Sequence, residues 1–135
     1  MADLSITAAN VKPNSVLVAI SPVTLGETIT AGQPLYKSTT DGKYYRADAD
    51  VASTARVDGI CILGGTADTV GIIQRAGELQ IGATVTKGET YVVSTNVGQI
   101  CPRSDLAAGD FISILGVAKS TSVLRLVVSP TEISI

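Results

Sequence analysis

The sequence repeats a turn-rich pattern within itself, and this repeat limits the folds that the chain can adopt. Residues 26–43, GETITAGQPLYKSTTDGK, align without gaps on residues 82–99, GATVTKGETYVVSTNVGQ, with seven identities in 18 positions. The shared residues are Gly, Thr and Ser, which favour turns and extended backbone. Each copy then ends in a hairpin pattern, GGTADTVGIIQ in the first and KSTSVLRLVVS in the second. We therefore predict an internal duplication with two repeats, over about residues 16–76 and 77–135.

The remaining pattern is that of strands. Val, Ile and Thr dominate, and long runs of helix-forming residues are missing. The segment SVLVAI at 15–20 alternates, which predicts a strand with Val16, Val18 and Ile20 on one face. DADVASTA at 48–55 and RSDLAAGD at 103–110 each predict one short helical turn, because a polar N-cap precedes small residues. The sequence predicts an all-β, mainly antiparallel fold, compact and resembling a barrel or a sandwich.

The two ends of the chain are candidates for contacts with a partner. Residues 1–15 contain Leu4 and Ile6 among small polar residues and Pro13, which predicts an extended N-terminal arm that becomes ordered on another surface. Residues 16–135 form a single β domain in this interpretation, because a repeat of about 50 residues is too small to bury its own apolar face. Near the C-terminus, alternation places Ile133 and Ile135 on one side of an added edge strand. Simple fraying is the alternative for each end.

Composition excludes several classes of function. The chain has no His and no Trp, and its 10 Lys and Arg residues are scattered in a sequence of net charge −2. Histidine-dependent catalysis is therefore absent, and no basic stripe is available to follow a nucleic acid. No apolar run approaches the roughly 20 residues that a membrane span needs. We expect a protein that is not an enzyme, uses no cofactor, and binds neither nucleic acid nor membrane.

Few residues invite a chemical role. Cys61 and Cys101 lie in apolar surroundings that favour buried free thiols, although pairing stays open. The carboxylates of the segment DGKYYRADAD at 41–50 do not follow the spacing of a calcium-binding EF-hand loop, so we interpret the segment as a solvated loop and expect no metal.

The same segment carries the one cluster that combines aromatic and cationic side chains. Tyr44, Tyr45 and Arg46 follow one another there, and Tyr and Arg are frequent anchors of protein interfaces. In a strand only one of the two tyrosines can face the core. The other is either simply exposed or in contact with a partner.

A family resemblance emerges from two longer patterns. Residues 30–50 read T-x-G-x-P-L-Y-x-S-T-x-D-G-K-x-Y-x-A-D-A-D, and residues 109–124 read G-D-F-I-S-I-L-G-V-A-x-S-T-S-V-L. Together with the turns between them, they resemble the small capsid cement (decoration) proteins of tailed bacteriophages over residues 26–128. The resemblance implies a virion protein, made in the host cytoplasm, that binds the major capsid protein on the outer capsid surface. It also implies a homo-oligomer, often a trimer, that stabilises capsomer junctions.

The alternative function comes from the same resemblance. Modules of this kind also look like parts of phage head fibres and tail proteins, so a receptor-binding or glycan-binding module is the second expectation. Such a module needs exposed aromatic platforms, and the chain has one Phe and four Tyr to supply them.

Overall fold

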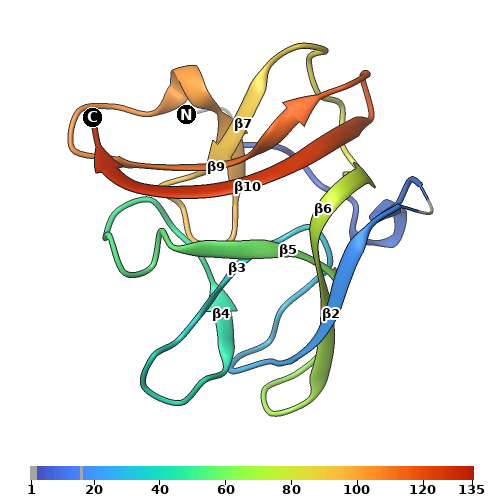
Figure 1. Ribbon diagram of the computed structural model, residues 1–135, viewed down its shortest axis with the longest axis vertical. Helices are drawn as coiled ribbons and strands as arrows, with labels where there is room; N and C mark the ends of the chain where they lie inside the picture. Colours follow the sequence, from blue (N-terminus) through green and yellow to red (C-terminus); the bar gives the residue numbers. More distant parts are fainter. Residues whose placement is uncertain (1–2, 16) are drawn as a thin grey trace.

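The chain forms one curled antiparallel sheet of ten strands, which confirms the predicted fold class (Figure 1). The computed structural model describes residues 3–15 and 17–135. Within these ranges the helical content is limited to two 3-10 turns, η1 (Ala8–Asn10) and η2 (Arg103–Asp105). The strands are β1 (Lys12–Pro13), β2 (Ala19–Thr24), β3 (Pro34–Lys37), β4 (Tyr44–Arg46), β5 (Val57–Leu63), β6 (Val70–Gln80), β7 (Thr90–Val93), β8 (Ile100–Pro102), β9 (Phe111–Ala118) and β10 (Val123–Ser134).

The two halves of the chain arrange their corresponding strands in the same order, read from each end of the sheet to its centre. The path runs β4-β3-β5-β6-β10-β9-β7-β8, so that β4 and β8 are its outer strands and β6 pairs with β10 at the centre. The register repeats as well: Leu35 of β3 faces Gly59 of β5, and Tyr91 of β7 faces Gly116 of β9, with a register shift directly after each pair. The two halves therefore share one pattern of pairing. A duplication in the ancestry of the chain stays a prediction.

The repeated glycines account for part of this shared geometry. Gly42 and Gly98 lie 56 positions apart, in the turns before β4 and β8, and both have φ of +74°. Residues with a β-carbon rarely adopt this backbone conformation. The serine four positions earlier closes each turn in the same way: Ser38 N donates to Lys43 O at 2.9 Å, and Ser94 N donates to Gln99 O at 3.0 Å. The sequence echo thus corresponds to two turns of like geometry.

The largest apolar cluster draws on both halves of the chain. It joins Ile60 and Leu79 to Tyr91, Leu115 and Leu124, all of which are at most 2% exposed. Burial of apolar surface is the main favourable contribution to folding, so neither half can keep its share of this core alone.

The cysteines lie elsewhere. Cys61 and Cys101 are buried free thiols in two smaller clusters, as the sequence favoured.

Strand β6 links the two halves because it changes partners along its length. Its first part pairs with β2 and β5, and its last part pairs with β10 and β1. At the change, Gly77 has φ of +92° and the fully buried Gln74 donates from Nε2 to the carbonyls of Ala76 and Glu78, at 3.2 and 3.0 Å. The amide thus binds two carbonyls beside the irregularity, of which Glu78 O also accepts from Asn14 N at 2.9 Å. Gln74 Oε1 has no hydrogen-bond partner among the described residues.

Some local predictions need correction. The strand expected at 15–20 begins only at Ala19 and continues to Thr24, and its buried residue is Val23, whereas Ile20 is 50% exposed. Side chains alternate along a strand, so Ile20 and Val23 point to opposite faces, and the face that the sequence pattern marked is the outer one. Val16 lies outside the described residues.

The predicted helical turns and C-terminal strand are present in modified form. The turn expected at 48–55 is a single hydrogen-bonded turn in which Ala55 N donates to Val51 O at 3.0 Å, and the turn expected at 103–110 is η2. The C-terminal segment does not form a separate strand. It continues β10, which pairs with β9 as far as Ser134.

Candidate functional site

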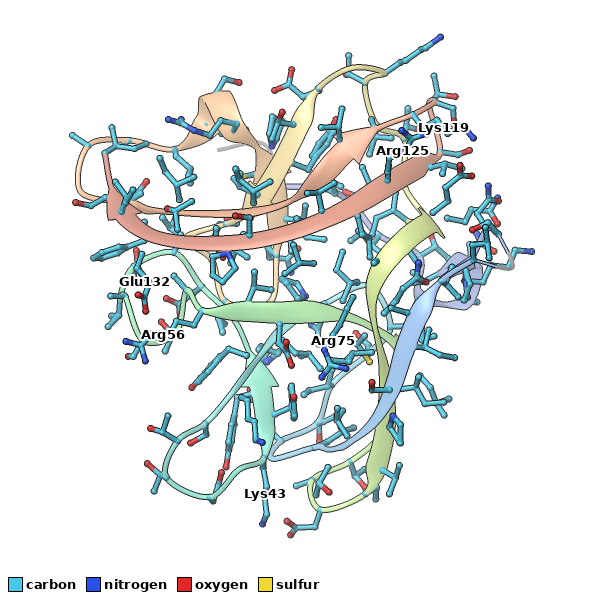
Figure 2. All side chains as sticks on the ribbon, viewed as in Figure 1. Lys43, Arg56, Arg75, Lys119, Arg125 and Glu132 are labelled. Carbon is cyan, nitrogen blue, oxygen red and sulfur yellow. The ribbon has the colours of Figure 1, made fainter. Side chains whose placement is uncertain are left out.

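Tyr44 is the tyrosine of the predicted cluster that faces the interior. It is buried on β4, and its hydroxyl donates to Asp58 Oδ2 at 2.6 Å. Arg75 completes the arrangement: Nη2 lies 2.9 Å from the same carboxylate oxygen, and Nη1 donates to Ser21 Oγ (Figure 2). The Arg75 guanidinium holds the pKa of Asp58 below its ordinary value, and burial together with the Asp58 hydrogen bond raises the pKa of Tyr44. Tyr44 thus links β4 to β5 and β6, and its hydroxyl is not available to a partner.

Tyr45 points to the other side of β4 and is half-buried by its own chain. Its hydroxyl donates to Asp41 Oδ2 at 2.6 Å, a bond that raises the pKa of Tyr45 and lowers that of Asp41. Its ring lies 6.2 Å from that of Tyr36, centre to centre, and covers Gly26. Tyr36 and Tyr45 therefore form one small aromatic surface, which remains a candidate contact area.

Arg46 closes the edge of the sheet together with Glu27. The backbone N–H of Arg46 donates to Glu27 Oε2 at 2.9 Å, and Nη2 donates to Oε1 at 3.2 Å. The aliphatic part of Arg46 packs beside Gly98, where an added β-carbon would lie 3.0 Å from Arg46 Cδ. One guanidinium nitrogen, Nε, is buried without a hydrogen-bond partner among the described residues.

The described part of the N-terminal arm lies on its own chain. Leu4 N donates to Ile100 O at 2.8 Å, and Thr7 N donates to Gly82 O at 2.9 Å. Leu4 and Ile6 are half-buried against the largest apolar cluster. These side chains thus have an intramolecular site, and their contact with a partner stays a prediction.

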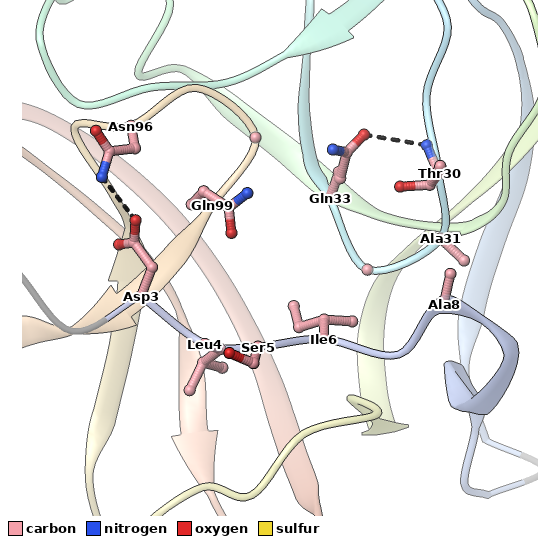
Figure 3. A pocket seen from close by; sticks show the side chains of 12 residues that line it. Asp3, Leu4, Ser5, Ile6, Ala8, Thr30, Ala31, Gln33, Asn96 and Gln99 are labelled. Atoms are coloured by element: carbon pink, nitrogen blue, oxygen red, sulfur yellow. Dashed lines mark hydrogen bonds between the residues drawn. The ribbon is translucent and has the colours of Figure 1, made fainter.

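A polar groove of about 560 Å³ opens between the arm and two turns, at 30–33 and 96–99 (Figure 3). In this groove Asn96 Nδ2 donates to Asp3 Oδ2 at 2.7 Å, and Gln33 Oε1 accepts from Thr30 N at 3.0 Å. Asp3 Oδ1 is buried and has no hydrogen-bond partner in the described part of the chain. Amides of Gln33 and Gln99 also line the groove. The groove thus offers both donors and acceptors.

The C-terminal residues are the most exposed of the predicted contacts. Ile133 is 62% exposed and Ile135 is 44% exposed, although the backbone N–H of Ile135 donates to Asp110 O and its carbonyl accepts from Gly109 N, both at 2.9 Å. An ion pair between Arg56 and Glu132 fastens the same end of β10 to the loop before β5 (Figure 2). The segment therefore presents apolar side chains from a fixed backbone.

The predicted contact residues do not form one continuous site. The Tyr36 and Tyr45 surface, the arm and the C-terminal strand belong to different regions of the sheet. Sequence reasoning did not assign the carboxylates that hold Tyr44, Tyr45 and Arg46 in place, because each acts across the fold or a turn rather than in a motif. They are Asp58, Asp41 and Glu27. Among the described residues, no three His, Cys, Asp or Glu side chains are placed to hold a metal ion together.

The fold defines an all-β protein of a single curled antiparallel sheet. Comparison with protein-family models, with curated protein sequences and with solved structures found no match. In the part of the chain that the structure describes, no helix is long and apolar enough to cross a membrane.

Proposed function

We propose that this chain is a structural binding protein that attaches to the outer surface of a bacteriophage head and stabilises capsomer junctions, as a cement protein does. The observation that carries the proposal is a set of exposed large apolar side chains on a sheet whose outer strands are both capped. The exposed set comprises Leu17, Ile20, Val51, Leu63, Val70, Val97, Val117, Val127, Ile133 and Ile135. Neighbouring apolar side chains in water mark interaction surfaces, and Leu17 and Val127 of this set line one groove.

The capping of the outer strands favours association through faces and loops. On β4, Gly26 N donates to Tyr44 O at 2.8 Å and Glu27 accepts the N–H of Arg46. On β8, the arm donates to Ile100 O, and Pro102 has no N–H to offer. Capping of β4 and β8 blocks the addition of strands at both ends of the path. In the described part of the chain β2 stays an uncapped edge, interrupted by Pro22, which has no N–H to offer.

The proposed partners are the major capsid protein and further copies of this chain, most simply as a trimer. The family resemblance over residues 26–128 supports both, and it supports a location on the outer capsid surface of the virion after synthesis in the host cytoplasm. The proposed role requires no catalysis and no cofactor.

The proposal is tested by adding the purified chain to heads that were assembled and expanded without it. We expect saturable binding, greater resistance of the heads to heat, and a mass above that of the monomer in light scattering. A strict monomer that does not bind heads would contradict the proposal.

A second candidate, a glycan-binding module of a fibre or tail, is favoured by the groove of Figure 3. Sugar hydroxyls both donate and accept hydrogen bonds, and the groove is lined by Asp3 together with the amides of Gln33 and Gln99. The aromatic surface of Tyr45 is a separate place for a sugar ring. Binding on a glycan array that is lost in Asp3→Ala or Tyr45→Ala would support this candidate, and an array without binding would remove it.

A further inference from the structure

One outer face of the sheet combines apolar side chains with an unpaired cation. Side chains alternate along β10, so Leu124 and Leu126 are buried while Arg125 and Val127 point outward. We call the outward side chains of this region the Arg125 surface. It consists of Leu17, Ala19, Ala76, Val117, Arg125 and Val127.

Register shows that these side chains are neighbours. Val127 faces Ala76 across the central strand pair, and Ala76 faces Ala19 of β2 on its other side. Leu17, two residues before Ala19, lines the same shallow groove as Val127. The exposed fraction is 85% for Leu17 and 57% for Val127, so this row lies in solvent.

The cationic part of the surface lies on the next outward row. Arg125 faces Val117 of β9, which is 40% exposed, and it faces Glu78 of β6 on the other side. The Glu78 carboxylate is already occupied, because Lys119 Nζ lies 2.5 Å from Oε2 and Asn14 Nδ2 donates to Oε1 at 3.2 Å. Arg125 makes no hydrogen bond or ion pair with any described residue, and Figure 2 shows it beside Lys119.

A second cation strengthens the local charge. Lys87 lines a small hollow together with Val117, Lys119 and Arg125. Glu78 forms an ion pair with Lys119 and also attracts Arg125. Lys87, Lys119 and Arg125 together carry more positive charge than Glu78 neutralises. An unpaired guanidinium flanked by apolar side chains is the arrangement found at the energetic centres of protein interfaces.

We propose that the Arg125 surface docks a segment of a partner protein that presents a carboxylate between apolar side chains. The carboxylate accepts two hydrogen bonds from the Arg125 guanidinium, and the apolar side chains cover Val127 and Leu17 on one side and Val117 on the other. Covering these side chains removes water around the ion pair and strengthens it. The inference rests on the proposed role as a binding protein and names the chemistry of its partner.

The test that identifies the chemistry uses a random peptide library displayed for selection on the immobilised full chain. We expect enrichment of peptides with Asp or Glu next to Leu, Ile, Val or Phe, and weaker binding as salt rises. Arg125→Glu should weaken the selected peptides by about tenfold or more, Val127→Ser should weaken them less, and Lys37→Glu should leave them unchanged. Lys37 is an exposed cation of β3 and serves as the matched control. Arg125→Glu places a second carboxylate opposite Glu78, which lowers stability by itself. Arg125→Gln avoids this repulsion, should unfold at the wild-type temperature and should still weaken the selected peptides.

The inference is overturned if selection enriches no acidic and apolar peptides, or if Arg125→Glu binds them as the wild type does. Heads separate this inference from the proposed function. If heads bind the wild type and Arg125→Glu equally, the docking surface is wrong and the cement role stands. If heads do not bind the wild type while the peptides still require Arg125, the cement role is wrong and the docking surface stands.

Discussion

The ring of Tyr45 lies directly over the backbone of Gly26, so close that a β-carbon on Gly26 would come within 2.2 Å of Tyr45 Cζ. Gly82, the matching glycine of the second copy, is required for another reason. Its φ is +74°, and a β-carbon there would lie 2.6 Å from the carbonyl oxygen of Thr7 in the arm. Both repeats thus have glycine at this position for different reasons: Gly26 leaves room for a ring, and Gly82 adopts a positive φ beside the arm.

The first prediction follows from this contact. Gly26→Ala should push the Tyr45 ring away and break its hydrogen bond to Asp41, at a cost on the order of 1 to 3 kcal/mol in the free energy of unfolding. In a Tyr45→Ala background the same change should cost less than about 0.5 kcal/mol, because the obstacle is gone. Urea unfolding of the four proteins measures the coupling.

Gly88→Ala provides the matched control for this cycle. Gly88 has φ of +86° and open space where a β-carbon would lie. Its cost, about 1 kcal/mol from backbone strain, should be the same with and without the Tyr45 ring. Equal costs of Gly26→Ala in both backgrounds would show that the ring does not restrict position 26.

The second prediction concerns the capped edge of β4. Glu27→Ala removes the acceptor of the Arg46 N–H and the partner of its guanidinium, so we expect a loss of about 1 to 3 kcal/mol and a greater tendency to aggregate. Glu132→Ala removes only an ion pair with Arg56 whose side chains are 54% and 51% exposed, and should cost less than about 1 kcal/mol. Urea unfolding and light scattering on heating compare the two variants. Similar losses would mean that Glu27 contributes only as a surface charge.

The fold class was predictable from the sequence because it depends on local pattern. Val and Ile in short runs between Gly, Ser and Thr turns indicate strands wherever they occur, and the echo placed Gly42 and Gly98 in matching turns. The inward face of β2 was not predictable, because alternation separates two faces without saying which one meets the core. The partner change in β6 depends on Gln74, whose neighbours are set by the whole sheet.

The contact residues were predictable only in part. Alternation required one tyrosine to face inward, and Tyr44 does. Its network with Asp58 and Arg75 joins three strands and has no signature in the sequence. The exposure of Arg125 and Val127 could be found by alternation along β10 once the strand is recognised, but their nearness to Leu17 depends on β2 pairing with β6.

The third prediction separates two roles of the arm. Ile6 is half-buried against the largest apolar cluster and lies over Gly32. Ile6→Ala in the isolated chain should therefore cost about 1 to 2 kcal/mol. Ile20→Ala, at a 50% exposed position, should change stability by no more than about 0.5 kcal/mol. If both changes are neutral, the arm contributes nothing to the stability of the isolated chain, and only a role on a partner remains for it.

The fourth prediction is a dependence of stability on acid. Arg75, and then Tyr44, keep the pKa of Asp58 in the folded chain below its ordinary value of 3.8. Above the ordinary value the carboxylate is charged in both states and its stabilisation is complete; as pH falls through the lower folded pKa, this stabilisation is lost. Asp58→Asn should be less stable at pH 7 and should lose less on going from pH 5 to pH 3. Parallel losses in urea unfolding would contradict a role of this carboxylate.

The last prediction uses the two buried thiols as reporters of unfolding. Burial raises the pKa of Cys61 to about 11 and that of Cys101 to about 12, so at pH 8 about a thousandth or less of either thiol is the reactive thiolate. Both are also fully covered in the folded chain. A thiol reagent such as DTNB should therefore react slowly with the native protein and rapidly in urea. Single Cys61→Ala and Cys101→Ala variants assign the two reactions. Because the two thiols lie in separate clusters of one sheet that unfolds cooperatively, both reaction rates should rise at the same urea concentration. Two separated transitions would show that the halves unfold independently.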